Sequence, residues 1–288
     1  MKILITGING QLGQELLQKL GDREAIGVGR ERLDLTQPES IRQVVAAVKP
    51  DVVINSAAYT AVDKAESEVE LAMQVNAIAP GILAQECQKL GIPLIHVSTD
   101  YVFDGTQGYP YQDTDKTNPL SVYGKSKLAG EDAIRSHCEH HAIVRTAWVY
   151  GVGGTGNFVK TMLRLASQRE EIRVVADQIG SPTWTGDLAN AIVGLLKQTP
   201  PGTYHYTNSG VASWYDFAVA IFEEAKQLGW DLKVQRVIPI TTPEYPTPAR
   251  RPAYSVLSLK KTSELLGTYP PHWRQSLRQM LAVLQAKG

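Results

Sequence analysis

Cysteine is scarce in this sequence, and long apolar runs are missing. Cys87 and Cys138 are the only cysteines among 288 residues, too few for a disulfide framework. The longest apolar runs have the length of a strand, so we expect no transmembrane helix. A strand that begins at Lys2 leaves no room for a removable signal peptide. These absences argue against a disulfide-rich secreted protein and a membrane protein, and they favour the cytoplasm.

An excess of charge is also lacking. Lysine plus arginine and aspartate plus glutamate each number 29, so the formal net charge is zero. Such a chain has no broad basic field to attract nucleic acid, and an anionic ligand would have to be met by local positive groups. The content of 43% apolar and 20% charged residues is ordinary for a globular protein. The length allows one large or two modest domains.

What the sequence does contain is an alternation of strand and helix patterns through its first half. Short apolar runs are separated by stretches with helical spacing, which predicts an α/β fold. A glycine-rich crossover begins at Gly151, and the later segments are less regular. Strands are predicted at 2–6, 25–28, 51–56, 92–97, 142–150 and 205–208, and helices at 37–48, 69–90, 185–196 and 214–228, the last with Ser213 as its N-cap.

Three glycines follow the first predicted strand. Gly7, Gly10 and Gly13 lie between that strand and an amphipathic helix. Glycine permits a tight turn and lets the backbone approach a pyrophosphate, whose charge is favoured by the N–H groups and the dipole of the helix start. This arrangement predicts a dinucleotide-binding loop.

Arg30 follows the second predicted strand. Many NAD-binding folds carry an acidic residue at this point, which binds the ribose hydroxyls. An arginine can instead meet a 2′-phosphate. The sequence therefore favours NADPH as the cofactor, with NADH possible.

Tyr123 and Lys127 are four residues apart, so on a helix they lie on one face. A lysine ammonium beside a phenol favours the phenolate and is expected to lower the tyrosine pKa from about 10. That would make Tyr123 a general acid or base for a carbonyl and alcohol pair. The spacing alone arises by chance in many helices, but Ser98, Thr99 and Asp100 end the fourth predicted strand, and ligands bind at that edge of a parallel sheet.

Together these motifs resemble the extended short-chain dehydrogenases/reductases, and within them the dTDP-4-dehydrorhamnose reductases. The glycine loop, the strand end STDYVFDG and the YxxxK pair carry the wider resemblance. The narrower one extends through nearly the whole chain, in the stretches INSAAYTAVDKAES (54–67), STDYVFDG (98–105), NPLSVYGKSKLAGE (118–131), VRTAWVYG (144–151), NFVKTML (157–163), ADQIGSPTW (176–184) and RPAYSVLSLKK (251–261).

The resemblance implies a Rossmann-type doubly wound parallel sheet with a smaller C-terminal substrate-binding portion. Residues 1–150 would form the NADP-binding domain and residues 151–288 mainly the substrate-binding portion, with helix 185–196 packing back on the sheet. The implied reaction is reduction of dTDP-4-dehydro-β-L-rhamnose to dTDP-L-rhamnose by hydride transfer from NADPH, in dTDP-rhamnose biosynthesis. A homodimer is possible.

The resemblance also implies roles for individual residues. Thr99, Tyr123 and Lys127 would be catalytic, with Thr99 polarising the carbonyl and Ser98 as the competitor for that role. The cofactor would contact Gly7, Gly10, Gln11, Leu12, Gly13, Arg30, Asp34, Leu35, Ala57, Ala58, Tyr59, Tyr123 and Lys127. The substrate would contact Thr99, Asp100, Trp148, Asn157 and Arg251.

Several of these residues have structural alternatives. Asp34 can equally lead the following helix, and Trp148 can be a core residue. Arg250 or Arg251 would bind the diphosphate of the substrate, since planar guanidinium groups suit phosphate, but either can lie on the surface or pair with a carboxylate.

Polar residues in two further stretches are expected to be structural. Asn76 stands in the middle of an apolar helical stretch, where a polar side chain is commonly a satisfied hydrogen bonder. The cluster of Asp63, Lys64 and Glu66 reads as a solvated helix start.

No metal site is predicted. The histidines and cysteine at 137–141 lack the spacing of a zinc site, and Glu15, which resembles an acid that some relatives use for an interfacial magnesium, is a single ligand.

Two other functions stay open, because fold does not fix function. The chain could be a non-catalytic NADP-binding regulatory subunit, or a reductase or epimerase of another nucleotide sugar.

Overall fold

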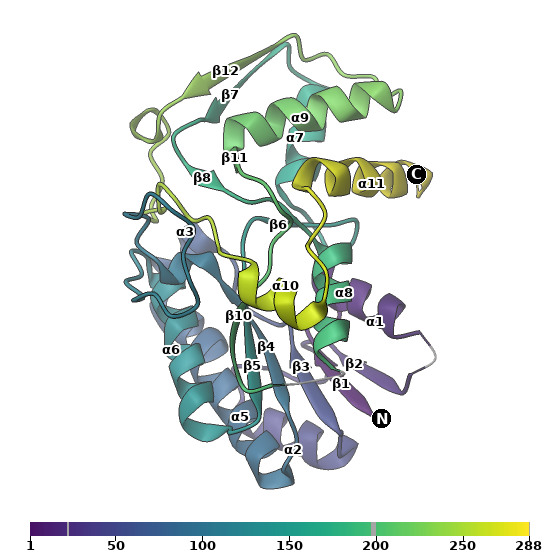
Figure 1. Ribbon diagram of the computed structural model, residues 1–288, viewed down its shortest axis with the longest axis vertical. Coiled ribbons are helices and arrows are strands. Elements are labelled where there is room, and N and C mark those ends of the chain that lie inside the picture. Colours follow the sequence, from purple (N-terminus) through teal and green to yellow (C-terminus); the bar gives the residue numbers. More distant parts are fainter. Residues whose placement is uncertain (22, 197–199, 288) are drawn as a thin grey trace.

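The computed structural model describes residues 1–21, 23–196 and 200–287. Residues 197–199 and 288, which fall within the predicted portion 151–288, lie outside this part. Figure 1 shows a sheet with helices on both faces and, beyond one end of the sheet, a smaller group of elements from the second half of the chain. The predicted Rossmann-type α/β fold is confirmed.

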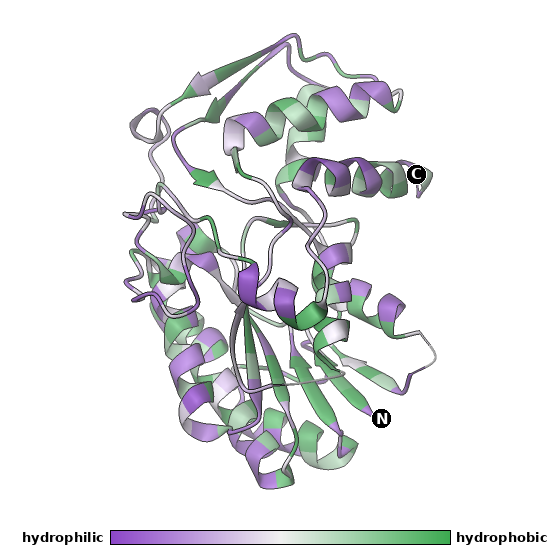
Figure 2. Ribbon diagram, in the orientation of Figure 1, coloured by the Kyte–Doolittle hydropathy of each residue, from purple (hydrophilic) through white to green (hydrophobic). Residues whose placement is uncertain are grey.

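Six parallel strands form the central sheet, in the order β10-β5-β4-β3-β1-β2. They are β1 (Ile3–Thr6), β2 (Ala25–Val28), β3 (Val52–Asn55), β4 (Leu94–Thr99), β5 (His141–Thr146) and β10 (Gly202–His205). Helices cover both faces, which requires strands that are apolar on both sides, and Figure 2 shows this hydrophobic character along the sheet. The chain leaves β1 on one side through β2 and returns on the other through β3. The carboxyl ends at such a reversal form a ligand-binding crevice.

Two apolar layers hold the helices on the sheet. On one face α1 (Gln11–Leu20) and α8 (Thr185–Leu195) share a buried cluster with the strands. On the other face α2 (Pro38–Val48), α5 (Ala79–Leu90) and α6 (Val122–His137) surround a second cluster. Helix α8 therefore packs on the sheet, although it comes from the second half of the chain.

The last strand of the sheet also comes from the second half. The sequence predicted a strand at 205–208, but β10 spans Gly202–His205 and pairs with β5, with Tyr204 opposite Val144. The predicted strand thus lies three residues too far toward the C-terminus. Tyrosines stand on both sides of His205, at 204 and 206, so the local pattern does not define the limits of the strand. Its pairing with β5 defines them. The sheet thus continues past residue 150.

The predicted strand 142–150 is broken in two. β5 ends at Thr146, and Val149–Tyr150 forms β6, which pairs with β9 (Thr183–Trp184) outside the main sheet. The break lies at Trp148, whose φ of 48° is a left-handed value that non-glycine residues rarely adopt. This reversal turns the Trp148 ring toward Trp214 of the C-terminal portion, and the two rings stack with centroids 3.5 Å apart.

The predicted helix 69–90 is also interrupted. It consists of α4 (Val69–Met73), a π-helical turn (Gln74–Ile78) and α5. Asn76 is buried in the π-turn, where its side-chain amide accepts from Tyr59 N at 2.9 Å and donates to Tyr59 O and Ser126 Oγ, each at 3.0 Å. The structural role predicted for Asn76 is confirmed.

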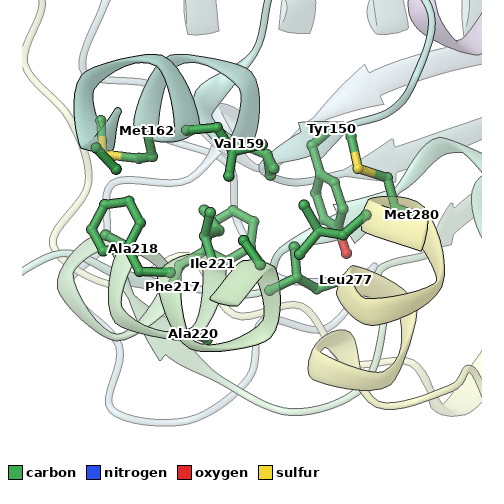
Figure 3. Close-up of a cluster of buried hydrophobic side chains, with 14 of the residues drawn as sticks. Tyr150, Val159, Met162, Phe217, Ala218, Ala220, Ile221, Leu277 and Met280 are labelled. Carbon is green, nitrogen blue, oxygen red and sulfur yellow. The ribbon is translucent and has the colours of Figure 1, made fainter. Parts of the chain in front are cut away.

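The C-terminal elements have a core of their own. Helices α7 (Phe158–Ala166), α9 (Trp214–Gln227) and α11 (Trp273–Ala286) meet around buried side chains that include Phe217 and Leu277, and Figure 3 shows these helices turning apolar residues toward one another. Ser213 caps α9 through a capping box with Asp216, as predicted for the start of this helix. Beside them β7 (Glu171–Val175) and β12 (Arg236–Ile240) form a parallel pair.

Short elements complete the chain. They are α3 (Val62–Ala65), the 3-10 turns at Asp100–Val102 and Thr242–Glu244, β8 (Ile179–Gly180), β11 (Ala212–Ser213) and α10 (Lys260–Leu266). Within the described ranges, no helix has both the length and the apolar character needed to cross a membrane.

Candidate active site

A cavity of about 740 Å³ opens at the carboxyl ends of the strands. Its volume is within the range of ligand pockets in proteins. The lining comes mainly from the segments at the ends of β1, β2, β3, β4 and β5, the start of α6 and, farther along the chain, the loop at 154–156, Leu188 and Trp214. The predicted residues that line it are Gly7, Gly10, Gln11, Leu12, Gly13, Arg30, Asp34, Leu35, Ala57, Ala58, Tyr59, Thr99, Asp100, Tyr123, Lys127 and Trp148.

The glycine loop forms one wall of this cavity. Gly7 has a φ of 76°, and a Cβ on it would lie 2.8 Å from the backbone of Ala57, so only glycine lets β1 and β3 approach this closely. Helix α1 begins at Gln11 without a side-chain cap and without an acidic residue in its first turn. Its first N–H groups can therefore receive a phosphate.

Arg30 and Asp34 lie together at another part of the lining. The Arg30 side chain is 80% exposed, and its Nε is 3.8 Å from Asp34 Oδ2. Hydrogen bonds from the backbone and hydroxyl of Thr36 lower the pKa of Asp34, and Arg30 lowers it further. The exposed guanidinium remains accessible to an anion. Both predicted roles of Asp34, as a cofactor contact and as the residue that leads the next helix, agree with the structure. Asp34 lines the cavity, and its carboxylate accepts hydrogen bonds from Thr36 in the turn before α2.

Tyr123 enters the cavity from the first turn of α6. Ser121 caps this helix by accepting from Gly124 N at 3.2 Å, and Glu66 Oε1 accepts from Val122 N at 2.8 Å. Burial raises the pKa of Tyr123 to about 12, against a smaller lowering by the Thr99 hydroxyl. The expectation that Lys127 would lower this pKa is wrong for the structure described, because loss of hydration dominates at the phenol.

Lys127 reaches from α6 to strand β4. Its Nζ donates to Val97 O at 2.7 Å and lies 3.2 Å from His96 Nε2. The residue is only 1% exposed, and this burial lowers the pKa of the ammonium to about 8, while the charge of Glu131 acts in the opposite direction. Because Lys127 also lines the cavity, the ammonium sits between the strand end and the ligand space.

The hydroxyls of Ser98 and Thr99 at the end of β4 have different hydrogen-bond partners. Thr99 Oγ1 donates to Asp100 Oδ1 at 3.0 Å and accepts from Tyr101 N at 3.1 Å, and it interacts with Tyr123. Ser98 Oγ instead donates to Glu131 at 2.6 Å, so its hydroxyl is already used in the interior. Burial raises the pKa of Asp100 to about 6, despite hydrogen bonds from Ser255 and Thr99.

Two predicted substrate residues do not line the cavity. Asn157 caps α7 by accepting from Lys160 N, and its amide nitrogen donates to Gln11 and to Gly151 O. Arg251 forms a bidentate pair with Asp63 at 2.8 and 3.0 Å, which is the carboxylate pairing that the sequence left open. Their contacts with a substrate stay predictions.

The sequence reasoning missed several residues that shape the site. Asp63 and Glu66 stand at a partly exposed helix start, as predicted, but they also bind Arg251 and the start of α6. His96 and Asn55 lie beneath Lys127. Trp214 lines the cavity with its stacked partner. The helix pattern of 214–228 gave no sign of this last role, because Trp214 comes from a region far away in the chain.

No three histidine, cysteine, aspartate or glutamate side chains gather in a metal-binding arrangement among the residues with described positions. The cluster at 137–141 is used locally instead. Cys138 Sγ lies 3.3 Å from His140 O, and His141 Nδ1 lies 2.6 Å from Cys138 O.

The chain matches the RmlD substrate binding domain family over residues 1–286. It is 43% identical to dTDP-4-dehydrorhamnose reductase of Escherichia coli strain K12 over 98% of this chain and 97% of that protein. It is 45% identical to the spore coat polysaccharide biosynthesis protein SpsK of Bacillus subtilis, over 97% of this chain and 96% of that protein.

Solved structures agree with this. The dTDP-4-dehydrorhamnose reductase of Bacillus anthracis, in complex with NADP, superposes with a TM-score of 0.92 at 41% identity, over 98% of this chain and 100% of that one. The UDP-glucose 4-epimerase of Thermus thermophilus, in complex with NAD, shares the fold, with a TM-score of 0.83 at 22% identity over the whole length of both chains. The match over nearly the full length shows that the chain belongs to the RmlD substrate binding domain family, which includes the dTDP-4-dehydrorhamnose reductases.

Proposed function

We propose that this protein is the NADPH-dependent reductase that converts dTDP-4-dehydro-β-L-rhamnose to dTDP-L-rhamnose, in dTDP-rhamnose biosynthesis. The observation that carries this proposal is a buried tyrosine beside a threonine hydroxyl, in a cavity that the glycine loop after β1 also lines. Reduction of a ketone consumes one hydride and one proton. A phenol with a pKa of about 12 holds its proton at neutral pH and can donate it.

The residues of the cavity fit NADPH. The uncapped start of α1 and the close approach at Gly7 suit the pyrophosphate. The exposed Arg30 suits the 2′-phosphate of NADPH, and Ala57 and Ala58 leave space along the β3 end. When bound, the cofactor supplies the hydride for the keto carbon.

Three side chains act on the carbonyl oxygen and its surroundings. Tyr123 donates the proton, and Thr99 would turn its hydroxyl proton from Asp100 to the carbonyl oxygen. Lys127 provides a positive charge beside the ribose and the developing alkoxide. The stabilisation of the alkoxide by this charge increases as negative charge forms on the oxygen. The shared contact of Tyr123 and Thr99 supports this grouping.

The sugar nucleotide would lie toward Asp100 and Trp148, on the side of the cavity nearest the C-terminal portion. The tryptophan pair offers a flat apolar surface to a sugar or a base. Asn157 and Arg251 remain proposed contacts. For Arg251 this requires the guanidinium to exchange Asp63 for a phosphate, so Arg251→Ala should raise the KM for the substrate.

The test is to mix purified protein with NADPH and enzymatically prepared dTDP-4-dehydro-β-L-rhamnose and to follow the absorbance of the reduced cofactor. Wild type should oxidise NADPH in proportion to the ketone, and Tyr123→Phe should lose about 100-fold or more in kcat. Tyr206→Phe is the matched control, since it removes another buried phenol hydroxyl that does not line the cavity.

The outcomes separate the alternatives. NADPH binding without oxidation, together with a partner enzyme that co-purifies, would contradict the proposal and favour a regulatory subunit. Oxidation with a different keto-sugar alone would keep the chemistry and change the substrate. Full activity of Tyr123→Phe would overturn the assignment of the proton donor.

A cytoplasmic location and a homodimer are further proposals. The first rests on the use of NADPH and the two unpaired cysteines, and fractionation of the source cell tests it. Light scattering of the purified protein tests the second.

A further inference from the structure

A row of buried polar groups crosses the sheet beneath Lys127. Thr6 Oγ1 on β1 lies 2.6 Å from Asn55 Oδ1 on β3, and Asn55 Nδ2 lies 2.9 Å from His96 Nδ1 on β4. His96 Nε2 in turn lies 3.2 Å from Lys127 Nζ. At most 1% of each of these four residues is exposed. Such a network is costly to bury unless each member is satisfied.

The chemistry of the groups restricts how the row can be protonated. Burial, and then the charge of Lys127, lowers the pKa of His96 far below its usual value, so the ring is neutral and has one donor and one acceptor nitrogen. A lysine ammonium has three donors and no acceptor. When Lys127 is charged, His96 Nε2 must therefore be the acceptor and Nδ1 must carry the proton.

The Asn55 amide can complete this arrangement. With its oxygen facing His96, it accepts from Nδ1–H, and its NH₂ group then donates to Thr6. The two ends of an amide occupy equivalent positions, so rotating the group by half a turn preserves the distances. The charge of Lys127 thus fixes the tautomer of His96, and Asn55 and Thr6 on the neighbouring strands can satisfy it.

We propose that His96, oriented by Asn55 and Thr6, is a positioning residue for Lys127: its Nε2 accepts one N–H of the ammonium, Val97 O accepts another, and the third is directed into the cavity. This inference rests on the proposed function, because the group being positioned is the lysine beside the cofactor ribose. The partners of Lys127 lie on β4, while Tyr123 lies on α6. His96 therefore fixes the lysine relative to the sheet and not merely relative to its own helix.

Kinetics of three variants test the role. His96→Met removes the acceptor while keeping an apolar side chain of similar length, and it should lower kcat by about 10- to 100-fold, the typical cost of a misplaced catalytic group. His96→Gln keeps an amide oxygen near the position of Nε2 and should stay within about 3-fold of wild type. His205→Gln is the matched control, because His205 is a buried histidine of the same sheet that bonds to Tyr111 O and does not line the cavity.

A purely structural His96 would give another pattern. All three variants would then lower the melting temperature, and kcat of the folded fraction would stay unchanged. Equal loss of kcat in His96→Met and His96→Gln, or no loss in either, overturns the positioning role.

The second test needs no turnover. Nitrogen-15 NMR of the histidine rings in the free protein at pH 7 should show His96 neutral with its proton on Nδ1, the signal being identified by its absence from His96→Gln. A proton on Nε2 overturns the proposal, since the ring would then donate toward Lys127. If wild type failed to oxidise NADPH, the proposed function would fail, while this measurement would still decide what His96 does.

Discussion

The carboxylate of Glu131 is the most heavily bonded charged group in the described part of the interior. Arg145 donates to it through Nε at 3.0 Å and Nη2 at 2.7 Å, Ser98 donates at 2.6 Å, and Arg135 donates at 2.6 Å. Glu131 is fully buried and Arg145 is 2% exposed. Burial alone would raise the pKa of Glu131, but the bonds and charge of Arg145 and the bond from Ser98 hold it below its usual value.

Glu131→Gln should therefore be strongly destabilising. Its amide can keep one oxygen acceptor, but the NH₂ group would face N–H donors of Arg145 and Arg135, and Arg145 would be left buried without a counter-charge. Removing one partner of a buried ion pair costs about 3–5 kcal/mol. At roughly 2–3 °C for each kcal/mol in a chain of this size, the melting temperature should fall by roughly 6–15 °C.

Thermal unfolding followed by circular dichroism measures this loss, with Glu86→Gln as the control because Glu86 makes its ion pairs at the surface. The double variant Glu131→Leu with Arg145→Met should lose less stability than Glu131→Gln, since it leaves no unpaired charge. A fall of less than about 1 kcal/mol in Glu131→Gln would refute the reasoning. A double variant less stable than the single one would do so as well.

Other perturbations give separate tests. Asp100 has a folded pKa of about 6, above the usual 3.8, so its ionisation lowers the stability of the protein as the pH rises from 3.8 to 6. In thermal melts at pH 8, Asp100→Asn should therefore be on the order of 1–3 kcal/mol more stable than wild type. At pH 4 the variant should show no gain in stability. Arg30→Glu should reverse the preference for NADPH over NADH in steady-state kinetics, because it repels the 2′-phosphate. Gly130→Ala places a Cβ 2.0 Å from a carbonyl of the π-turn and should cost about 1–3 kcal/mol in urea unfolding, while Gly108→Ala, with open space around it, should not. Because the pKa of the Tyr123 phenol is about 12, the phenol itself should not titrate between pH 6 and 9, and the rate of ketone reduction should fall only as the Lys127 ammonium loses its proton around its pKa of about 8, whereas alcohol oxidation with NADP⁺ should be favoured by higher pH in the same buffers.

The parts of the fold that sequence could predict were those with a local cause. β2 spans Ala25–Val28 as predicted, because an apolar run between turn residues needs no distant partner to be recognised. Ser213 was identified as an N-cap for the same reason. The break at Trp148 and the limits of β10 depend on partners elsewhere in the chain, Trp214 and β5, which no local pattern contains.

The candidate site likewise has features that the sequence predicts and features that it does not. The glycines, Tyr123 and Lys127 line one cavity, because the carboxyl ends of parallel strands must meet at one edge. The electrostatics did not follow from spacing. A model-peptide view predicts a phenol whose pKa is lowered by its neighbour, whereas burial acts on Tyr123 more strongly than any nearby charge. Depth of burial is a property of the assembled fold.

This difference bears on the direction of the chemistry. The UDP-glucose 4-epimerase of Thermus thermophilus shares the fold, and a fold does not by itself select a reaction. A reaction that begins by oxidising an alcohol needs a base, and a phenolate is favoured by a nearby positive charge. Here Lys127 is turned toward His96 and Val97, and the phenol of Tyr123 keeps its proton. In its protonated form Tyr123 can serve as the acid that reduction of a ketone needs.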